Sequence, residues 1–233
     1  MPTKETHSDL SDAPAYTIAD AAKYLGLPVT TVRTWVKGQN YKVRDDVRRY
    51  RPLVKAADSS KGLLSFRNLV ELHVLSVTRR IHGISMPKMR TAVNYLQEAF
   101  GTDHPLADVP IKTDGISIFV EQLQELVSAS GAGQLPIREI VAQYLQRVGR
   151  DKKGNLWLYP FTRSSDQMDQ PRVVVMDPRI SFGRPVIANT GVRTSILAAR
   201  YRAGDSMQAL VEDYGLDQAV IEEAIRCEMR KAA

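Results

Sequence analysis

Residues 16 to 38 read YTIADAAKYLGLPVTTVRTWVKG, and this stretch decides the fold of the N-terminal part of the chain. Thr17 is a favourable N-cap residue, and the apolar residues after it recur at helical spacing. Gly26 can supply the left-handed turn that ends a helix. The pattern predicts a first helix whose inward positions are Ile18, Ala21, Ala22 and Leu25.

A second helix is expected directly after this turn. Pro28 suits the first turn of a helix because its φ is already close to the helical value. The short side chains of Ala21 and Ala22 let two helices cross closely. The inward positions of the second helix are Val32 and Trp35 or Val36. The combination predicts a helix-turn-helix, and the alternative is an ordinary helical hairpin with a solvated polar face.

The outward face of the second helix suits the major groove of duplex DNA. Arg33 is placed to reach guanine edges, and the threonines around it can meet phosphates or thymine methyl groups. The candidate DNA-contacting residues of the motif are Thr17, Thr30, Thr31, Arg33, Thr34 and Lys37.

The positive charge of the chain is concentrated in the same region. The 233 residues carry a net charge of +6 and are 43% hydrophobic, enough to bury a sizeable core. Residues 16–100 contain 15 Lys and Arg against 6 Asp and Glu, whereas residues 101–190 contain 10 against 10 and residues 191–233 contain 6 against 7. A generally basic protein would explain the total but not this asymmetry. The distribution indicates that the helix-turn-helix module binds a polyanion.

A basic segment follows the motif and predicts a β-hairpin. Two short β-prone runs, Arg49 to Val54 and Leu63 to Phe66, flank a polar loop, as the wing of a winged helix would. Such a wing can contact phosphates and the neighbouring minor groove, although a solvated basic loop is an equal alternative. Its candidate DNA-contacting residues are Arg44, Arg48, Arg49, Arg51, Lys55 and Lys61.

Two helices are expected after the hairpin. Ser65 caps the first, which is predicted to end at His82-Gly83, and the second begins at residues 84–87. The second helix has an apolar stripe that suits either the core or a dimer seam, since helix-turn-helix proteins commonly bind two half-sites as symmetric dimers. The stripe consists of Met89, Val93, Leu96 and Phe100.

The first hundred residues resemble the winged-helix DNA-binding domain of MerR-type regulators. The resemblance is carried by YTIADAAKYLGLPVTTVRTW, by the predicted wing, and by FRNLVELHVLSVTRRIHGISMPKMRTAVNYL. It implies that a helix and a wing dock together on duplex DNA.

The middle of the chain is mixed in character. A hairpin is expected through residues 113–115, a flexible connection over residues 128–133, an amphipathic helix from Pro136 to Val148, and a strand from Leu156 to Phe161. The polar run that begins at Ser164 predicts a linker.

The C-terminal part predicts a hairpin followed by three helices. The strands are Val173 to Met176 and Arg184 to Ile187, and the expected helix caps and breaks are Thr194 or Ser195, Gly204, Ser206 and Gly215. The last two helices repeat the opening helix-turn-helix pattern. Their predicted exposed face carries Asp217, Glu222, Glu223 and Glu228. Because these carboxylates would repel phosphates, a protein interface is the better interpretation.

About fifty residues here, MDPRISFGRPVIANTGVRTSILAARYRAGDSMQALVEDYGLDQAVIEEAI, resemble a small domain of unknown function that occurs in antitoxins of VapB type. With the winged helix before it, the resemblance spans nearly the whole chain. It implies that the partner is a PIN-domain ribonuclease toxin and that the antitoxin represses its own operon. The candidate toxin-contacting residues are Arg193, Arg200 and Arg202, although the favoured interpretation of each is a solvated or internally paired arginine.

The predicted fold class is therefore α+β, mainly helical with small β-hairpins. It places a winged helix-turn-helix at the N-terminus and a hairpin with three homeodomain-like helices at the C-terminus. The expected divisions are a disordered tail 1–14, a DNA-binding domain 15–100, a connecting region 101–163, a linker 164–171 and an antitoxin domain 172–233.

The remaining signals favour a binding protein. The chain lacks the phosphate-loop, nucleophile-elbow and HExxH patterns of enzymes, and its single Cys227 permits no internal disulfide and no cysteine-based zinc site. We expect no cofactor, no metal, no membrane contact, and a homodimer in the cytoplasm at the nucleoid. The alternative function is a stand-alone MerR-like regulator whose C-terminal half senses a ligand.

Overall fold

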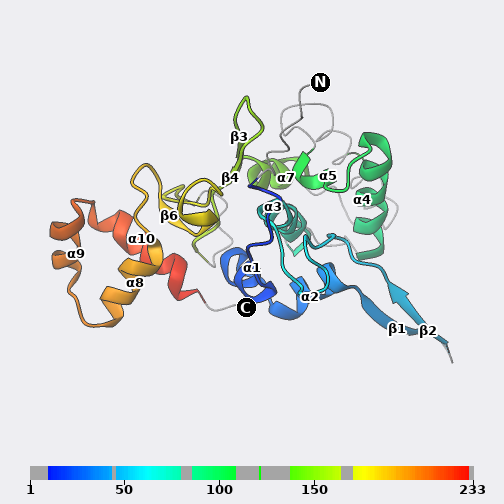
Figure 1. Ribbon diagram of the computed structural model, residues 1–233, viewed down its shortest axis with the longest axis horizontal. Helices are drawn as coiled ribbons and strands as arrows, with labels where there is room; N and C mark the ends of the chain where they lie inside the picture. Colours follow the sequence, from blue (N-terminus) through cyan, green and yellow to red (C-terminus); the bar gives the residue numbers. More distant parts are fainter. Residues whose placement is uncertain are drawn as a thin grey trace, which may run out of the picture.

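The computed structural model describes residues 10–43, 46–79, 86–108, 121, 137–163 and 170–230 (Figure 1). The predicted α+β class is confirmed, because helices dominate and the strands form small antiparallel pairs. The helices of the first half are α1 (Ile18–Leu25), α2 (Val29–Lys37), α3 (Phe66–Leu75), the 3₁₀ helix η1 (Ser76–Arg79), α4 (Met86–Phe100), α5 (Pro105–Asp108) and α7 (Ile137–Leu145).

The described strands form antiparallel pairs. The strands are β1 (Gln39–Val43) with β2 (Asp46–Tyr50), β3 (Val148–Arg150) with β4 (Leu156–Leu158), and β5 (Val174–Val175) with β6 (Val186–Ile187). The C-terminal helices are η2 (Ser181–Gly183), α8 (Thr194–Arg202), α9 (Met207–Tyr214) and α10 (Gln218–Met229).

The helix-turn-helix forms as its sequence predicts. Thr17 and Asp20 make a capping box, in which the Asp20 N–H donates to Thr17 Oγ1 at 3.0 Å and the Thr17 N–H donates to Asp20 Oδ2 at 3.0 Å. Gly26 ends α1 in the left-handed region, with φ of 62°. Pro28 lies at the N-cap of α2, one position before the first turn. The predicted inward residues Ala21, Ala22, Leu25, Val32, Trp35 and Val36 are buried.

The hairpin forms elsewhere than predicted. It consists of β1 and β2, with Gln39 opposite Tyr50 and Val43 opposite Asp46. Of the predicted strand at 49–54, only Arg49 and Tyr50 lie in β2, and the predicted strand at 63–66 is wrong. Leu53 and Val54 lie outside the hairpin because their N–H groups donate to the Trp35 carbonyl at 2.7 and 3.1 Å. These bonds hold the segment against α2.

The second predicted strand also has another structure. Leu63 makes a single bridge to Asp58, and Leu64 makes one to Tyr16. Phe66 then begins α3, because Ser65 forms a capping box with Asn68. The region between β2 and α3 is therefore a connection packed on the core.

Two helix ends also differ from the prediction. α3 ends at Leu75 and continues as η1, and the predicted end at His82-Gly83 lies outside the described residues. α7 ends at Leu145, because Val148 pairs with Leu158 in β3–β4. The residues 113–115, 128–133 and Pro136 likewise lie outside the described part.

The C-terminal hairpin forms where predicted, with shorter strands at Val174–Val175 and Val186–Ile187, and the caps Ser206 and Gly215 are as predicted. The N-cap of α8 differs from the prediction, because Arg193 takes the N-cap position and Thr194 is the first helical residue. The Thr194 hydroxyl is buried and lies 3.2 Å from the Pro185 carbonyl oxygen and 2.6 Å from Glu228 Oε1.

Two clusters of buried apolar residues hold the chain together. The first joins the helix-turn-helix to α3, α4, α5, α7 and β3–β4, and it extends as far as Met176. The second lies among β6, α8, α9 and α10. Ser11 is buried and Asp12 pairs with Arg67 at 2.8 Å, so the described end of the predicted tail packs on the first cluster.

His73 is buried in the first cluster, and its titration gives a pH prediction. Its Nε2 lies 3.0 Å from the Tyr144 carbonyl oxygen, and its ring lies 5.6 Å from that of Phe161. Burial lowers the pKa of His73 from 6.5 to about 4. Between these two values the unfolded chain binds more protons than the folded one, so stability rises with pH.

We predict that His73 lowers the free energy of unfolding by about 2 kcal/mol when the pH falls from 7 to 5. Urea unfolding at the two pH values measures the difference. His73→Gln should reduce the difference by about this amount, since glutamine does not titrate. An equal pH dependence in the two proteins would contradict the assignment.

Candidate nucleic-acid interface

The outward face of α2 is cationic and accessible. Thr30, Arg33 and Lys37 are exposed, Thr31 and Thr34 are half-buried, and α2 contains no acidic residue. The opposite face is fixed because Val32, Trp35 and Val36 are buried against the rest of the first cluster. The helix therefore presents one arginine and one lysine from a rigid support.

The β1–β2 hairpin extends from the end of α2 away from the body of the molecule (Figure 1). Gly38 makes the junction possible, since its φ is 76° and a Cβ there would lie 2.2 Å from the Tyr50 carbonyl oxygen. The Arg49 Nη2 donates to the Lys37 carbonyl at 3.1 Å. This bond satisfies a carbonyl at the C-terminus of α2 and ties β2 to that helix.

The hairpin carries several of the predicted arginines. Arg49 and Arg51 are exposed at its base. Arg44 and the side chain of Arg48 lie outside the described part of the structure. A two-stranded ribbon beside an exposed helix has the shape that can follow adjacent grooves of a duplex.

The two predicted lysines lie on the connection between β2 and α3 and are separate from the hairpin tip. Lys55 pairs with Asp103 at 2.7 Å, and Lys61 lies 3.9 Å from Asp58. The turn that contains Lys61 does reach α2, because a Cβ at Gly62 would lie 3.5 Å from the Lys37 side chain. Lys61 thus extends the basic end of α2, whereas the Lys55 charge faces a carboxylate.

Thr17 is exposed, but its hydroxyl is hydrogen-bonded within its own capping box. Its hydroxyl donates to Asp20 Oδ2 at 2.9 Å and accepts the Asp20 N–H at 3.0 Å. The residue fixes where α1 starts, and any contact with a phosphate would compete with Asp20.

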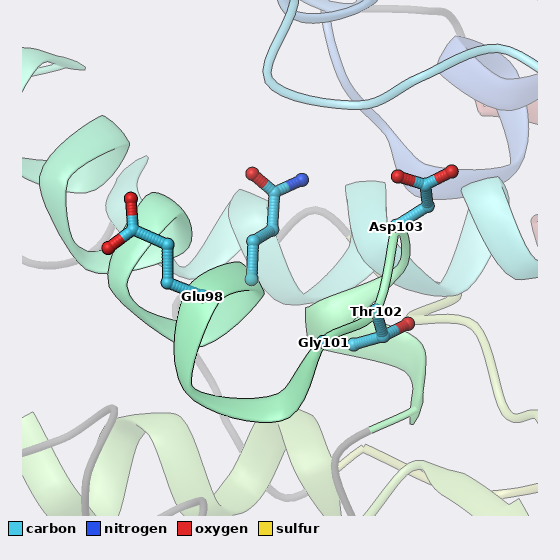
Figure 2. Close-up of a pocket in the computed structure, with 5 residues that line it drawn as sticks. Glu98, Gly101, Thr102 and Asp103 are labelled. Carbon is cyan, nitrogen blue, oxygen red and sulfur yellow. The ribbon is translucent and has the colours of Figure 1, made fainter.

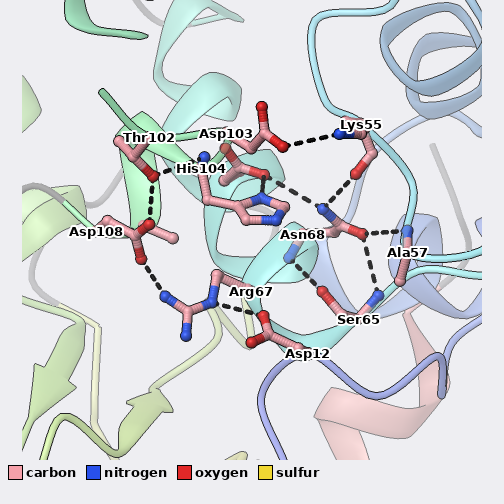
Figure 3. A network of polar contacts seen from close by, with 12 residues as sticks. Asp12, Lys55, Ala57, Ser65, Arg67, Asn68, Thr102, Asp103, His104 and Asp108 are labelled. Atoms are coloured by element: carbon pink, nitrogen blue, oxygen red, sulfur yellow. Dashed lines mark hydrogen bonds and ion pairs between the residues drawn. The ribbon is translucent and has the colours of Figure 1, made fainter. Parts of the chain in front are cut away.

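A polar network surrounds the start of α3 (Figure 3). Glu71 is buried, and its Oε2 lies 3.0 Å from His104 Nδ1. Burial raises the pKa of Glu71, and the hydrogen bond to Glu71 raises the pKa of His104. Asn68 caps α3 and donates to the Lys55 carbonyl at 2.9 Å. The network joins α3 to the Lys55 segment, so its role is structural.

An open hollow at the end of α4 does not suit DNA. It is lined by Gln97, Glu98, Gly101, Thr102 and Asp103, whose two carboxylates would repel phosphates (Figure 2). In the described part of the chain, no group of three or more His, Cys, Asp or Glu side chains is arranged to hold a metal ion. None of the described helices has the length and apolar character to span a bilayer.

The predicted toxin-contacting arginines on α8 differ from one another. Arg193 is exposed at the N-cap. Arg200 pairs with Asp205 at 2.5 Å and Asp213 at 2.6 Å, and these hydrogen bonds, the one to Asp213 above all, raise its pKa. Arg202 is exposed and its Nε donates to the Ala198 carbonyl at 3.0 Å.

Two of the predicted exposed glutamates on α10 are buried, which corrects the sequence interpretation. Glu223 is 2% exposed and pairs with Arg163 at 2.9 Å and with Arg226. Glu228 is 5% exposed and pairs with Lys23 of α1 at 2.5 Å. Helical periodicity placed Glu223 and Glu228 outward because Arg163 and Lys23, which pair with them, lie on distant segments of the chain.

Family models match both ends of the chain. One described as "Putative DNA-binding HTH domain" matches residues 14–93, and one described as "Protein of unknown function (DUF433)" matches residues 174–226. The chain thus joins a helix-turn-helix domain of DNA-binding type to a C-terminal domain of that uncharacterised kind.

Relatives match this chain over more than nine-tenths of its length. A Mycobacterium tuberculosis protein named "Putative antitoxin VapB45" is 29% identical over 92% of this chain and 93% of its own. The uncharacterised protein Rv2308 of the same organism is 22% identical over 94% of this chain and 91% of its own. The crystal structure of Rv2018 from M. tuberculosis matches with a TM-score of 0.68 and 28% identity, over 91% of this chain and 98% of that one. The predicted resemblance to a VapB-type antitoxin is confirmed.

Proposed function

We propose that this protein is the antitoxin of a type II toxin–antitoxin system. In this proposal it neutralises a PIN-domain ribonuclease and binds operator DNA to repress its own operon. The observation that carries the proposal is the exposed basic face of α2 beside the projecting hairpin, in a chain that resembles an antitoxin over more than nine-tenths of its length.

In the DNA complex, α2 occupies the major groove and β1–β2 acts as a wing, as in MerR-like domains. Arg33 reads a base edge, while Lys37, Lys61, Arg49 and Arg51 neutralise phosphates. Thr30, Thr31 and Thr34 fill the remaining positions along the groove.

A homodimer would place two such helices on two half-sites about 34 Å apart. The apolar stripe of α4 supplies little of that interface. Met89, Val93 and Leu96 are buried within the chain, and only Phe100, 41% exposed, is open to a partner.

The toxin is proposed to dock on α8 through Arg193 and Arg202. A PIN nuclease holds its metal ions with clustered carboxylates, so exposed arginines are complementary to the mouth of such a site. Arg200 instead serves the fold, because its two ion pairs join α8 to the α9 region.

We predict that Arg33→Ala weakens binding to the promoter of the protein's own gene by roughly 1 to 3 kcal/mol and relaxes sequence preference. Fluorescence anisotropy with promoter and scrambled duplexes measures both quantities. Arg172→Ala, an exposed arginine of the C-terminal half, is the matched control and should bind as the parent does. Unchanged affinity and preference in Arg33→Ala would remove Arg33 from base reading.

We predict that co-expression of this chain relieves the toxicity of a nuclease encoded by the neighbouring gene. Arg193→Glu with Arg202→Glu should abolish relief and co-purification of the nuclease by charge repulsion, while leaving promoter affinity unchanged. Arg172→Glu is the control for a charge reversal elsewhere in the C-terminal half. A harmless neighbour, or a small molecule that co-purifies instead, would favour a ligand-sensing regulator.

A further inference from the structure

The C-terminal helical group touches the first helix of the helix-turn-helix (Figure 1). The Tyr16 hydroxyl donates to the Gly183 carbonyl at 2.9 Å. The Arg184 Nη1 donates to the Tyr24 hydroxyl at 3.0 Å and lies 3.3 Å from Asp20. These contacts join η2 and the residue after it to both ends of α1.

Glu228 of α10 makes a further contact with α1. Its Oε2 pairs with Lys23 Nζ at 2.5 Å, and its Oε1 accepts the Thr194 hydroxyl at 2.6 Å. Thr194 follows Arg193 directly and begins α8. One buried carboxylate therefore connects the start of α8 to α1.

Two glycines show that this contact is closely fitted from both sides. A Cβ at Gly26 of α1 would lie 1.7 Å from the Arg230 guanidinium of the C-terminal segment. A Cβ at Gly183 would lie 2.0 Å from the Tyr16 hydroxyl. Each half of the chain thus contributes a glycine that admits a polar side chain of the other half. Both glycines also have positive φ, so their lack of a side chain serves two purposes.

The position of α1 determines that of α2. Ala21 and Ala22 of α1 and Val32 of α2 have no exposed surface, and the helices are joined by the short turn at Gly26. Close-packed helices with small residues at their crossing have little freedom to slide independently. A displacement of α1 would therefore move Arg33 relative to the DNA.

We propose that Glu228 is a positioning residue for DNA reading, which holds α1, and through it α2, against the C-terminal domain. This inference rests on the proposed function. The same contacts would couple toxin docking to DNA binding. A partner bound at Arg193 lies next to Thr194, and Thr194 shares the Glu228 carboxylate with Lys23. The path contains only contacts between neighbouring side chains.

The test uses the full chain with Glu228→Gln, Lys23→Gln and both together. Glutamine at 228 keeps an oxygen for the Thr194 hydroxyl and removes the charge that faces Lys23. Each single change should weaken binding to the promoter duplex about tenfold, as loss of one well-placed base contact does, while binding to a scrambled duplex is unchanged. The double change should be no worse than either single one, because both remove the same contact.

Two measurements distinguish a positioning role of Glu228 from a loss of folded protein and from the loss of a phosphate contact. A smaller folded fraction would weaken binding to both duplexes equally, and a lost phosphate contact would lower the salt dependence of binding by about one unit of slope. Lys23→Arg should restore promoter affinity. Asp213→Asn, which breaks an ion pair of 2.6 Å within the C-terminal group, is the matched control and should bind as the parent does.

Parent-like promoter affinity in both single variants, or additive effects in the double variant, would overturn the inference and leave the proposed function intact. A parent chain that does not prefer its own promoter would overturn both.

Discussion

Tyr16 is the residue on which the arrangement of the whole molecule depends. Its backbone pairs with Leu64 through bonds of 3.0 and 2.8 Å, which sets the start of α1 beside the start of α3. Its ring packs against Phe66 and Tyr24, with centroids 6.4 Å away in both cases, and its hydroxyl bonds to Gly183. A single buried side chain thus contacts the helix-turn-helix, its supporting helix and the C-terminal domain. The proposed DNA-reading surface is consequently positioned by more of the chain than the helix-turn-helix itself.

The middle region explains how the two ends come together. Leu158 and Met176 exchange backbone hydrogen bonds of 2.9 and 2.8 Å, which attaches β5 to β4 and to the first apolar cluster. Gln170, at the end of the predicted linker, is buried, and its Oε1 accepts the N–H groups of Thr162 and Arg163 at 3.0 and 2.9 Å. The predicted division at residues 164–171 stays a prediction, but the described residues on both sides of it pack against each other. A deletion from residue 172 would therefore remove Met176 from the first core, and point substitutions separate the functions of the two halves more cleanly.

The sequence predicted what depends on local chemistry. Thr17, Gly26, Ser65, Ser206 and Gly215 each act within a few residues, so their caps and turns could be read in order along the chain. The position of the hairpin could not be predicted in this way. The segment at Leu53 and Val54 is apolar enough for a strand, but its N–H groups bond to the Trp35 carbonyl. The candidate site shows the same division. The exposure of Arg33 and Lys37 follows from helical periodicity, whereas the pairing of Lys55 with Asp103 depends on a residue almost fifty positions away.

The acidic residues of the last two helices show how an expected surface charge can be assigned to the wrong residues. Glu223 and Glu228 were expected to face solvent and to repel phosphates, but they are buried and hold Arg163 and Lys23. The exposed acids of this unit are Glu212, Asp213 and Asp217. Although the ion pair with Arg200 offsets the charge of Asp213, Glu212 and Asp217 still disfavour a polyanion at this surface. The second helix-turn-helix-like unit therefore differs from the first in the direction of its charges. Those of α2 point outward to solvent, while Glu223 and Glu228 of α10 point inward to the rest of the chain.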